Sequence, residues 1–323
     1  MKKLISIVAS AYNEEGNVDE LARQLKAVFN ENDTYDFEVI LVENGSQDHT
    51  FEKMLKVNEE DGRFKIVRLS RNFRMDGGVT AGLNHASGNA AVIMTANLQD
   101  RPALITEFVK KWEEGYENVY GIVKKRTGKG LLRRFNSVLF YKIINAMTDG
   151  LIPENVSDFR LIDRKVYETI NFMNERNRFI RGMVAWTGFK SVGVEYERAR
   201  RFSGKSHACS LHVLQLAVSS IFAFSYIPIR SISVFGMLVS GISLLYLLFT
   251  VARIILKGVP FAGYGTIVSL IVLMFGILFF ILGILGEYIA QIYEEVKQRP
   301  SYVVSGKIGF DQERQSFDPP FAR

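Results

Sequence analysis

Residues 4–15 read LISIVASAYNEE, an apolar run that ends in a polar turn. Short runs of β-branched and apolar residues that stop at polar turns are typical of buried strands in a parallel sheet. Similar runs recur along the N-terminal half of the chain, and helical patterns lie between them. We expect strands at 4–9, 38–42, 64–68, 90–94 and 119–122, and helices at 18–29, 50–59, 77–86 and 103–114.

Strands that alternate with helices predict a Rossmann-like α/β fold, a mostly parallel sheet with helices on both faces. Ligands of such sheets bind beyond the carboxyl ends of the strands. Polar clusters follow four consecutive predicted strands: SAYNEE at 10–15, ENGSQD at 43–48, SRNF at 70–73 and TANLQD at 95–100. Together they can hydrogen-bond a base, a ribose and phosphates, although each cluster taken singly is also explained as a helix cap.

The composition narrows the class of protein. The 323 residues carry 40 Lys and Arg against 34 Asp and Glu, and 48% are hydrophobic. These values exclude a disordered tail, and the length fits about two folded units. The single cysteine, Cys209, excludes an intramolecular disulfide and a cysteine-based zinc site, and the four histidines lack metal-ligand spacing.

Two charge-free runs follow the α/β part, 21 residues at 232–252 and 29 residues at 258–286. Either run can cross a bilayer core, which needs about 20 apolar residues; a pair of buried core helices is the alternative. Lys and Arg flank the pair on both sides, which places both ends in the cytoplasm. We therefore expect a cytoplasmic α/β domain at 1–229, a transmembrane helical hairpin at 230–295 and a cytoplasmic tail at 296–323, in a multi-pass protein of the inner (plasma) membrane.

The motifs YNEE, ENGSQD, LSRNF, TANLQD and VSDFRLIDR occur in this order, and the second apolar run continues into GEYIAQIYEEVKQRPSY. This pattern resembles membrane-bound family-2 glycosyltransferases that load a sugar onto a polyprenyl phosphate, such as bacterial and phage bactoprenol glucosyltransferases and dolichyl-phosphate mannose synthases. The resemblance runs from about residue 4 to residue 302. It implies a GT-A type fold and inverting transfer from a nucleotide sugar to undecaprenyl phosphate, and it favours a UDP-linked donor.

The resemblance also assigns donor-binding residues. Tyr12, Asn13 and Glu14 match the loop that frames the nucleotide. Glu43 stands where the family usually has an Asp that faces the uracil, and Asp48 matches the Asp that closes that turn. The remaining donor-binding residues that it implies are Asn44, Ser46, Arg71, Asn72 and Asn97.

The metal motif departs from the family pattern. Where the family reads Asp-Ala-Asp, this chain reads Thr95-Ala96-Asn97, so both carboxylates expected to hold Mg²⁺ or Mn²⁺ are absent. Hard divalent cations prefer carboxylate and phosphate oxygens, and only Asn97, Gln99 and Asp100 remain as ligands of a weak site. Three interpretations stay open: a metal held mainly by the diphosphate, metal-free stabilisation of the leaving group by basic side chains, or a catalytically impaired membrane scaffold derived from such an enzyme.

Asp158 and Arg160 match the family's GDFRL element on the acceptor side. A phosphate monoester is already anionic near pH 7, so we expect Asp158 to orient the acceptor; an N-cap or an ion pair with Arg160 is the alternative. Basic residues after the fifth strand and in the RFSGKSH segment at 201–207 would neutralise phosphates, or else form a solvated charge run. The expected catalytic residues are Asp158, Arg160, Lys205 and Arg126, and the expected acceptor-phosphate residues are Arg133, Arg134, Arg178 and His207.

The sequence also indicates which partners to expect. Residues 131–147 and 211–224 have the pattern of helices that lie at a bilayer surface, with burial against the sheet as the alternative. Small residues in the apolar runs permit close helix contact and so a homo-oligomer. We expect a nucleotide sugar, a polyprenyl phosphate lipid and the membrane as partners, and no nucleic acid. The sequence does not identify the sugar.

Overall fold

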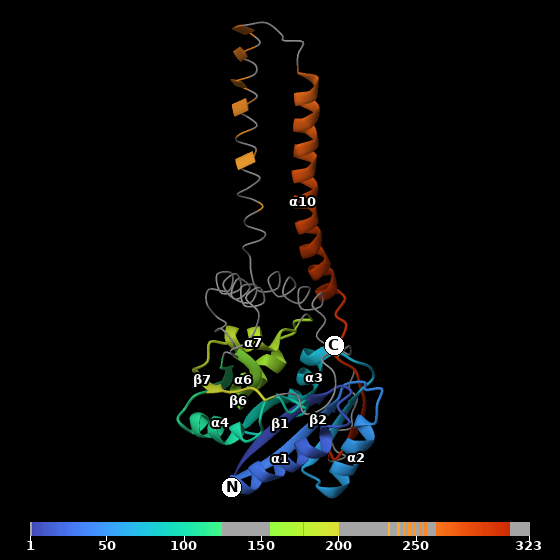
Figure 1. Cartoon of the computed structure of the whole chain (residues 1–323), viewed down its shortest axis with the longest axis vertical. Coiled ribbons are helices and arrows are strands. Elements are labelled where there is room, and N and C mark those ends of the chain that lie inside the picture. The colour runs from blue at the N-terminus through green and yellow to red at the C-terminus, as the bar shows by residue number, and fades with distance from the viewer. Residues whose placement is uncertain are drawn as a thin grey trace. The chain divides into compact units, whose positions relative to one another are not determined.

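The computed structural model describes residues 2–124, 156–176, 178–199 and 263–310, with scattered positions between 232 and 256 (Figure 1). The chain divides into two compact units. One unit contains the α/β sheet together with a C-terminal strand, and the other contains the apolar helix α10 (Tyr264–Val296).

An eight-stranded sheet with the order β7-β5-β6-β4-β1-β2-β3-β8 forms the core of the first unit. The pairs β1–β2, β1–β4, β2–β3 and β5–β7 are parallel, whereas β6 runs antiparallel to β4 and β5, and β8 runs antiparallel to β3. This confirms the predicted α/β fold with a mostly parallel sheet. The strands are β1 (Lys3–Ala11), β2 (Tyr35–Glu43), β3 (Phe64–Leu69), β4 (Ala90–Thr95), β5 (Asn118–Val123), β6 (Val156–Asp163), β7 (Ser191–Tyr196) and β8 (Val304–Ile308).

Successive side chains of a strand point to opposite faces of the sheet, and in the central strands both sets are buried. Helices therefore cover both faces. Ile5 and Ile7 belong to one buried cluster with residues of α1, whereas Val8 approaches Gly82 of α3. Helix α1 packs against α2 and α4, and α3 packs against α6 and α7. The helices are α1 (Val18–Glu31), α2 (Thr50–Glu60), α3 (Arg74–Leu83), α4 (Leu104–Glu113), α6 (Arg164–Phe172) and α7 (Ile180–Trp186).

The five predicted strands and four predicted helices all form, with shifted ends. The largest shifts are of three residues: β2 begins at Tyr35, and α3 begins at Arg74 and ends at Leu83. The side chain of Asn72 explains the earlier start, since its Oδ1 accepts the N–H of Arg74 at 2.7 Å and closes the turn that leads into the helix. The strands β6, β7 and β8 were not predicted.

The strand register brings the predicted site residues to one edge of the sheet. The parallel strands β1, β2, β3 and β4 all end there, so their polar turns are neighbours. Because β6 is antiparallel to β4, with Arg160 opposite Ile93, Asp158 lies towards the carboxyl end of β4. The start of β6 therefore joins the four turns.

Strand β8 closes the far edge of the sheet. It pairs with β3 from Ile66 opposite Ile308 to Leu69 opposite Val304. Tyr302 lies just before β8, and its hydroxyl accepts a hydrogen bond at 2.9 Å from Asn84, the residue that follows α3. The tail predicted at 296–323 therefore contributes a strand to the sheet.

Helix α10 is apolar and exposed. Its stretch Leu273–Val296 has 24 residues, a mean hydropathy of 2.2 and no buried share. Large side chains such as Phe275 and Phe279 are more than half exposed. By length and composition this helix can cross a membrane, and it is one such helix among the residues that the structure describes. The first predicted span, 232–252, falls mostly outside those residues, so the hairpin stays a prediction.

Candidate functional site

The first two turns interlock through short hydrogen bonds. The Asn13 N–H donates to Ser46 Oγ at 3.1 Å, and Asn13 Oδ1 accepts the Gln47 N–H at 2.8 Å. The next residue, Glu14, donates its N–H to Thr50 Oγ1 at 2.8 Å. Asn13 has a φ of +54°, a left-handed conformation that asparagine tolerates better than most residues. The YNEE turn is thus fixed against the ENGSQD turn.

Asp48 closes the second turn through its side-chain hydrogen bonds, as expected from the resemblance. Its Oδ1 accepts from the N–H and the hydroxyl of Thr50 at 3.1 and 2.5 Å, and its Oδ2 accepts the Glu15 N–H at 3.2 Å. These bonds satisfy the backbone N–H of Thr50, at the start of α2, and that of Glu15, the last residue of the YNEE turn. Asp48 therefore shapes both turns.

Asn44 joins the second turn to the third. Its Nδ2 donates to the Arg74 carbonyl at 2.7 Å, and its Oδ1 accepts the Phe73 N–H at 2.9 Å. Its own N–H donates to the Ala11 carbonyl at the end of β1, at 3.0 Å. This one buried amide links the ends of β1 and β2 to the start of α3.

Gly45 allows these turns to approach so closely. Its φ is +72°, and a Cβ placed on it would lie 2.4 Å from the carbonyl carbon of Arg71 and 2.5 Å from the Asn72 nitrogen. Only glycine combines this backbone conformation with so short a backbone contact. The Arg71 guanidinium turns back over the Phe73 ring, 4.1 Å from its centroid. The predicted residues Arg71 and Asn72 thus lie directly against the second turn.

Glu43 is buried beneath its turn, with 1% of its surface exposed. Its carboxylate accepts the Ser46 N–H and pairs with the Arg68 guanidinium at 3.3 Å. Arg68 in turn stacks on Phe51, 4.0 Å from the ring centroid. The carboxylate therefore supports the turn, and contact with a base stays a prediction.

The fourth turn forms a closed amide network. Asn97 Oδ1 accepts the Thr95 hydroxyl at 3.0 Å and the Gln99 N–H at 3.1 Å, and Asn97 Nδ2 donates to Gln99 Oε1 at 3.4 Å. The Ala96 N–H donates to the Ser10 carbonyl at 3.1 Å, which holds this turn beside the first. The side-chain oxygens of Asn97 and Gln99, two of the remaining metal ligands, thus already accept hydrogen bonds within the turn.

Asp100, the one carboxylate in that set, is also engaged. It is 2% exposed, accepts the Tyr196 hydroxyl and pairs with Arg198 at 3.1 Å. Burial and the charge of Asp100 raise the pKa of Tyr196, which keeps the phenol a donor. No group of three or more His, Cys, Asp or Glu gathers as a metal site within the described part of the chain. The protein residues do not fit a divalent cation held by the protein alone.

On the other side of the edge, Asp158 pairs with Arg181, a residue that the sequence analysis did not single out. Arg181 Nε and Nη2 donate to Asp158 Oδ1 at 3.1 and 2.7 Å. The Asp158 side chain keeps 39% of its surface exposed, whereas Arg160 is 3% exposed and donates to the Ser157 carbonyl at 3.1 Å. Asp158 is thus the most solvent-accessible member of a charged cluster that also contains Arg160 and Arg181.

The charges around Asp158 determine its ionisation. Burial by itself would raise the pKa of Asp158, but the guanidinium groups of Arg181 and Arg160 outweigh burial and hold that pKa below its usual value. Burial, together with the charge of Arg181, lowers the pKa of Arg160 to about 10. At neutral pH Asp158 is therefore an anion beside two cations.

Arg178, predicted at the acceptor phosphate, lies against the end of α6. Its Nη1 donates to the Met173 carbonyl at 2.9 Å and its Nη2 to the Ile170 carbonyl at 2.5 Å. Burial lowers its pKa. Two of its nitrogens therefore donate hydrogen bonds to carbonyl groups at the C-terminal end of α6. Other predicted site residues lie outside the described residues: Arg126, Arg133, Arg134, Lys205 and His207.

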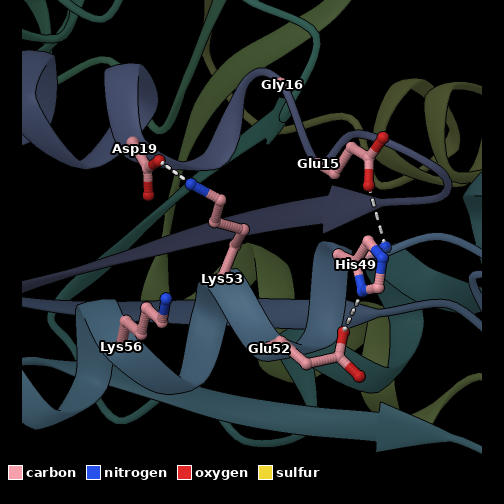
Figure 2. Close-up of a pocket in the computed structure, with 7 residues that line it drawn as sticks. All are labelled: Glu15, Gly16, Asp19, His49, Glu52, Lys53 and Lys56. Atoms are coloured by element: carbon pink, nitrogen blue, oxygen red, sulfur yellow. Dashed lines mark hydrogen bonds and ion pairs between the residues drawn. The ribbon is translucent and has the colours of Figure 1, made fainter.

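A surface hollow of about 450 Å³ lies between the starts of α1 and α2 (Figure 2). None of the predicted site residues lines it. Two of its carboxylates are already engaged: Asp19 pairs with Lys53 at 2.5 Å, and Glu15 accepts the backbone N–H of His49 at 3.0 Å. We therefore place the site at the strand ends and not in this hollow.

The chain belongs to glycosyltransferase family 2. Residues 6–170 match that family, described as "Glycosyl transferase family 2". The matched stretch holds the four turns and Asp158, and it ends before Arg181. The protein is thus a glycosyltransferase.

Relatives extend the similarity beyond the matched stretch. The uncharacterized glycosyltransferase YkcC of Bacillus subtilis is 38% identical over 96% of this chain and 95% of its own length. The SfII prophage-derived bactoprenol glucosyl transferase of Shigella flexneri is 34% identical over 93% of this chain and 97% of its own. Among solved structures, glucosyl-3-phosphoglycerate synthase of Mycobacterium tuberculosis, with Mn²⁺ and UDP-glucose, is 18% identical with a TM-score of 0.45 over 68% of this chain and 78% of that one.

Proposed function

We propose that this glycosyltransferase moves a sugar from a UDP-linked donor to polyprenyl (undecaprenyl) phosphate at the inner membrane. The observation that carries the proposal is the meeting of two parts at one sheet edge: the interlocked turns of β1, β2 and β3, and the half-exposed Asp158 held by Arg181. The bactoprenol glucosyl transferase of Shigella flexneri, similar over nearly its whole length, supports a lipid acceptor. The apolar helix α10 supports action at a membrane. In this proposal the α/β unit is cytoplasmic and residues 230–295 form the transmembrane hairpin.

In the proposed reaction an oxygen of the acceptor phosphate attacks the anomeric carbon from the face opposite the leaving group. The new bond joins that oxygen to the sugar, the bond from the sugar to UDP breaks, and its electron pair leaves with the diphosphate. No proton needs removal, because the acceptor is anionic near pH 7. Asp158 then orients the acceptor, and positioning with charge stabilisation supplies the rate. Arg126, Arg133, Arg134, Lys205 and His207 would neutralise phosphates.

Direct transfer tests this function. Membranes that contain the full chain are mixed with radiolabelled nucleotide sugars and polyprenyl phosphate, with and without Mn²⁺. We expect label in the butanol-extractable lipid and a thermal shift with UDP. Absence of transfer from every donor, with or without Mn²⁺, would contradict the proposal.

The second candidate is a membrane scaffold derived from such an enzyme. The closed network of Thr95, Asn97 and Gln99 favours it, since a metal would have to displace these bonds. UDP discriminates the two: a scaffold shows no thermal shift, whereas the enzyme shows one.

The double substitution Thr95→Asp with Asn97→Asp sharpens this choice. It restores two carboxylates at the end of β4, so we expect about a tenfold gain in Mn²⁺-dependent transfer if the rest of the site is intact. Lipid-extractable label with and without Mn²⁺ is the measurement. Asn89→Asp, at the opposite end of β4, is the control that adds a carboxylate away from the site and should leave transfer unchanged.

A further inference from the structure

Asp76 links α3 to the start of α7. It lies in the first turn of α3, and its Oδ1 accepts the backbone N–H of Ile180 at 3.1 Å. Ile180 is the first residue of α7, and the next residue is Arg181, which holds Asp158 at 2.7 Å. The carboxylates of Asp76 and Asp158 therefore fix two consecutive residues, one by its backbone and one by its side chain.

The same turn of α3 also contacts the donor side. Asn44 Nδ2 donates to the carbonyl of Arg74, two residues before Asp76. Gly78, two residues after it, packs so closely that a Cβ there would lie 2.4 Å from Ser10 Oγ at the end of β1. The first turn of α3 is thus held by the donor-side turns on one side and reaches Ile180 through Asp76 on the other.

A carboxylate is an unexpected choice for this position if its only task is to accept one N–H, because asparagine offers the same oxygen without a charge. The charged groups that face it are Asp158 and Arg160 from β6, Arg181 from α7, and Arg178 before α7. Burial, reinforced by Asp158, raises the pKa of Asp76 to about 6, although the Ile180 N–H and Arg181 oppose the rise. Asp76 is therefore ionised at neutral pH and belongs to the same charged cluster as Asp158.

We propose that Asp76 is a positioning residue for sugar transfer: it fixes the start of α7 so that Arg181 holds Asp158, and through α3 it ties this pair to the donor-side turns. The inference rests on the proposed function, because Asp158 matters through the acceptor that it orients. Asp76 itself touches neither donor nor acceptor in this account.

Two substitutions separate the charge of Asp76 from its hydrogen bond. Asp76→Asn keeps an oxygen for the Ile180 N–H and removes the charge, and Asp76→Ala removes both. With the full chain in membranes we expect kcat to fall about tenfold for Asp76→Asn and about a hundredfold for Asp76→Ala, with the KM for the donor within twofold. Asp61→Asn is the matched control, since Asp61 also accepts a backbone N–H and pairs with an arginine, at 3.1 and 2.7 Å, but at the far end of α2.

The pH profile gives a readout that a purely structural role would not move. The ratio of wild-type to Asp76→Asn kcat should be about ten above pH 7 and approach one below pH 5, since the side chain at position 76 is then neutral in both proteins. Taking the ratio cancels the titration of the acceptor phosphate. A ratio near one at every pH, or Asp76→Ala with wild-type kcat, would overturn the inference.

Hydrogen exchange keeps the test independent of activity. Amides of 178–186 should exchange faster in Asp76→Ala than in the wild type or Asp61→Asn, and unchanged exchange would overturn the inference. If the wild type transfers no sugar to polyprenyl phosphate, the proposed function fails, and exchange in 178–186 still decides whether Asp76 positions α7.

Discussion

The two sides of the sheet edge are built by different means. On the proposed donor side, side chains and backbone amides of the polar turns interlock at the ends of successive strands, with Asn44 and Gly45 at the centre. On the proposed acceptor side, charged groups far apart in the sequence meet: Asp76 from α3, Asp158 from β6 and Arg181 from α7. Turn chemistry therefore shapes the first side locally, whereas the second exists only when the fold is complete.

Asp158→Asn should produce the largest effect and break the acceptor side alone. Arg181 loses its ionic partner and the acceptor loses its orienting anion, so we expect transfer to fall about 10³-fold. The thermal shift with UDP should persist, because the hydrogen bonds given above for the turns after β1, β2 and β3 do not involve Asp158. Both quantities are measured on the same membranes. Glu168→Gln, an exposed acid on α6, is the control, and more than a third of wild-type activity in Asp158→Asn would contradict the assignment.

Gly45→Ala should break the donor side. The new Cβ would lie 2.4 Å from the Arg71 backbone at a φ of +72°, so we expect a loss of about 3 kcal/mol in the free energy of unfolding and no thermal shift with UDP. Denaturant unfolding of the full chain measures the first quantity. Gly62→Ala is the matched control, since a Cβ there meets nothing within 4 Å. Equal stability of the two variants would refute the close approach.

Asn44→Ala tests the same side with a smaller change. It removes two side-chain hydrogen bonds and leaves the Phe73 N–H and the Arg74 carbonyl without that partner. We expect about 2 kcal/mol of destabilisation and weaker UDP binding. Asn58→Ala, which removes a single bond to the Phe64 carbonyl, should cost about 1 kcal/mol and leave UDP binding unchanged. A UDP affinity equal to that of the wild type in Asn44→Ala would show that the two hydrogen bonds of the Asn44 side chain do not contribute to donor binding.

The smallest expected effect concerns pH. The pKa of Asp76 is about 6 in the folded protein and 3.8 as a free side chain, so the folded state binds more protons between these values. Its contribution to the free energy of unfolding is therefore full below about pH 4 and is lost as pH rises through 6. Between pH 5 and 7 we expect a decrease of about 1 kcal/mol in the wild type that is missing in Asp76→Asn. A parallel pH dependence in both proteins would contradict this.

The sequence predicts the central strands and the polar turns that meet at their ends well, because both depend on local patterns. Apolar runs mark β1 to β5, and the polar turns after them carry Asn13, Asn44 and Asp48. It misses β6, since Ser157, Asp158 and Arg160 interrupt the apolar pattern that marks a strand. The buried Arg160 is tolerated in this strand because its guanidinium donates a hydrogen bond to the Ser157 carbonyl.

The acceptor side is harder to predict from sequence. Asp76 lies one residue before the helix that the sequence predicts at 77–86, and Arg181 is one of several arginines near residue 180. Only the packing of α3 against α7 brings them together with Asp158. One signal was available: glycine within a helix indicates close packing against another element, and Gly78 packs against Ser10 and Asn44 at the strand ends.

Strand β8 has a consequence for the order in which the molecule is made. The ribosome synthesises α10 before residues 304–308, which supply the last strand of the sheet. Until then β3 carries a row of unpaired N–H and C=O groups, the kind of edge that invites association between chains. Completion of the α/β unit therefore waits for the whole apolar helix, and a chain that ends before residue 304 leaves that row without its cover.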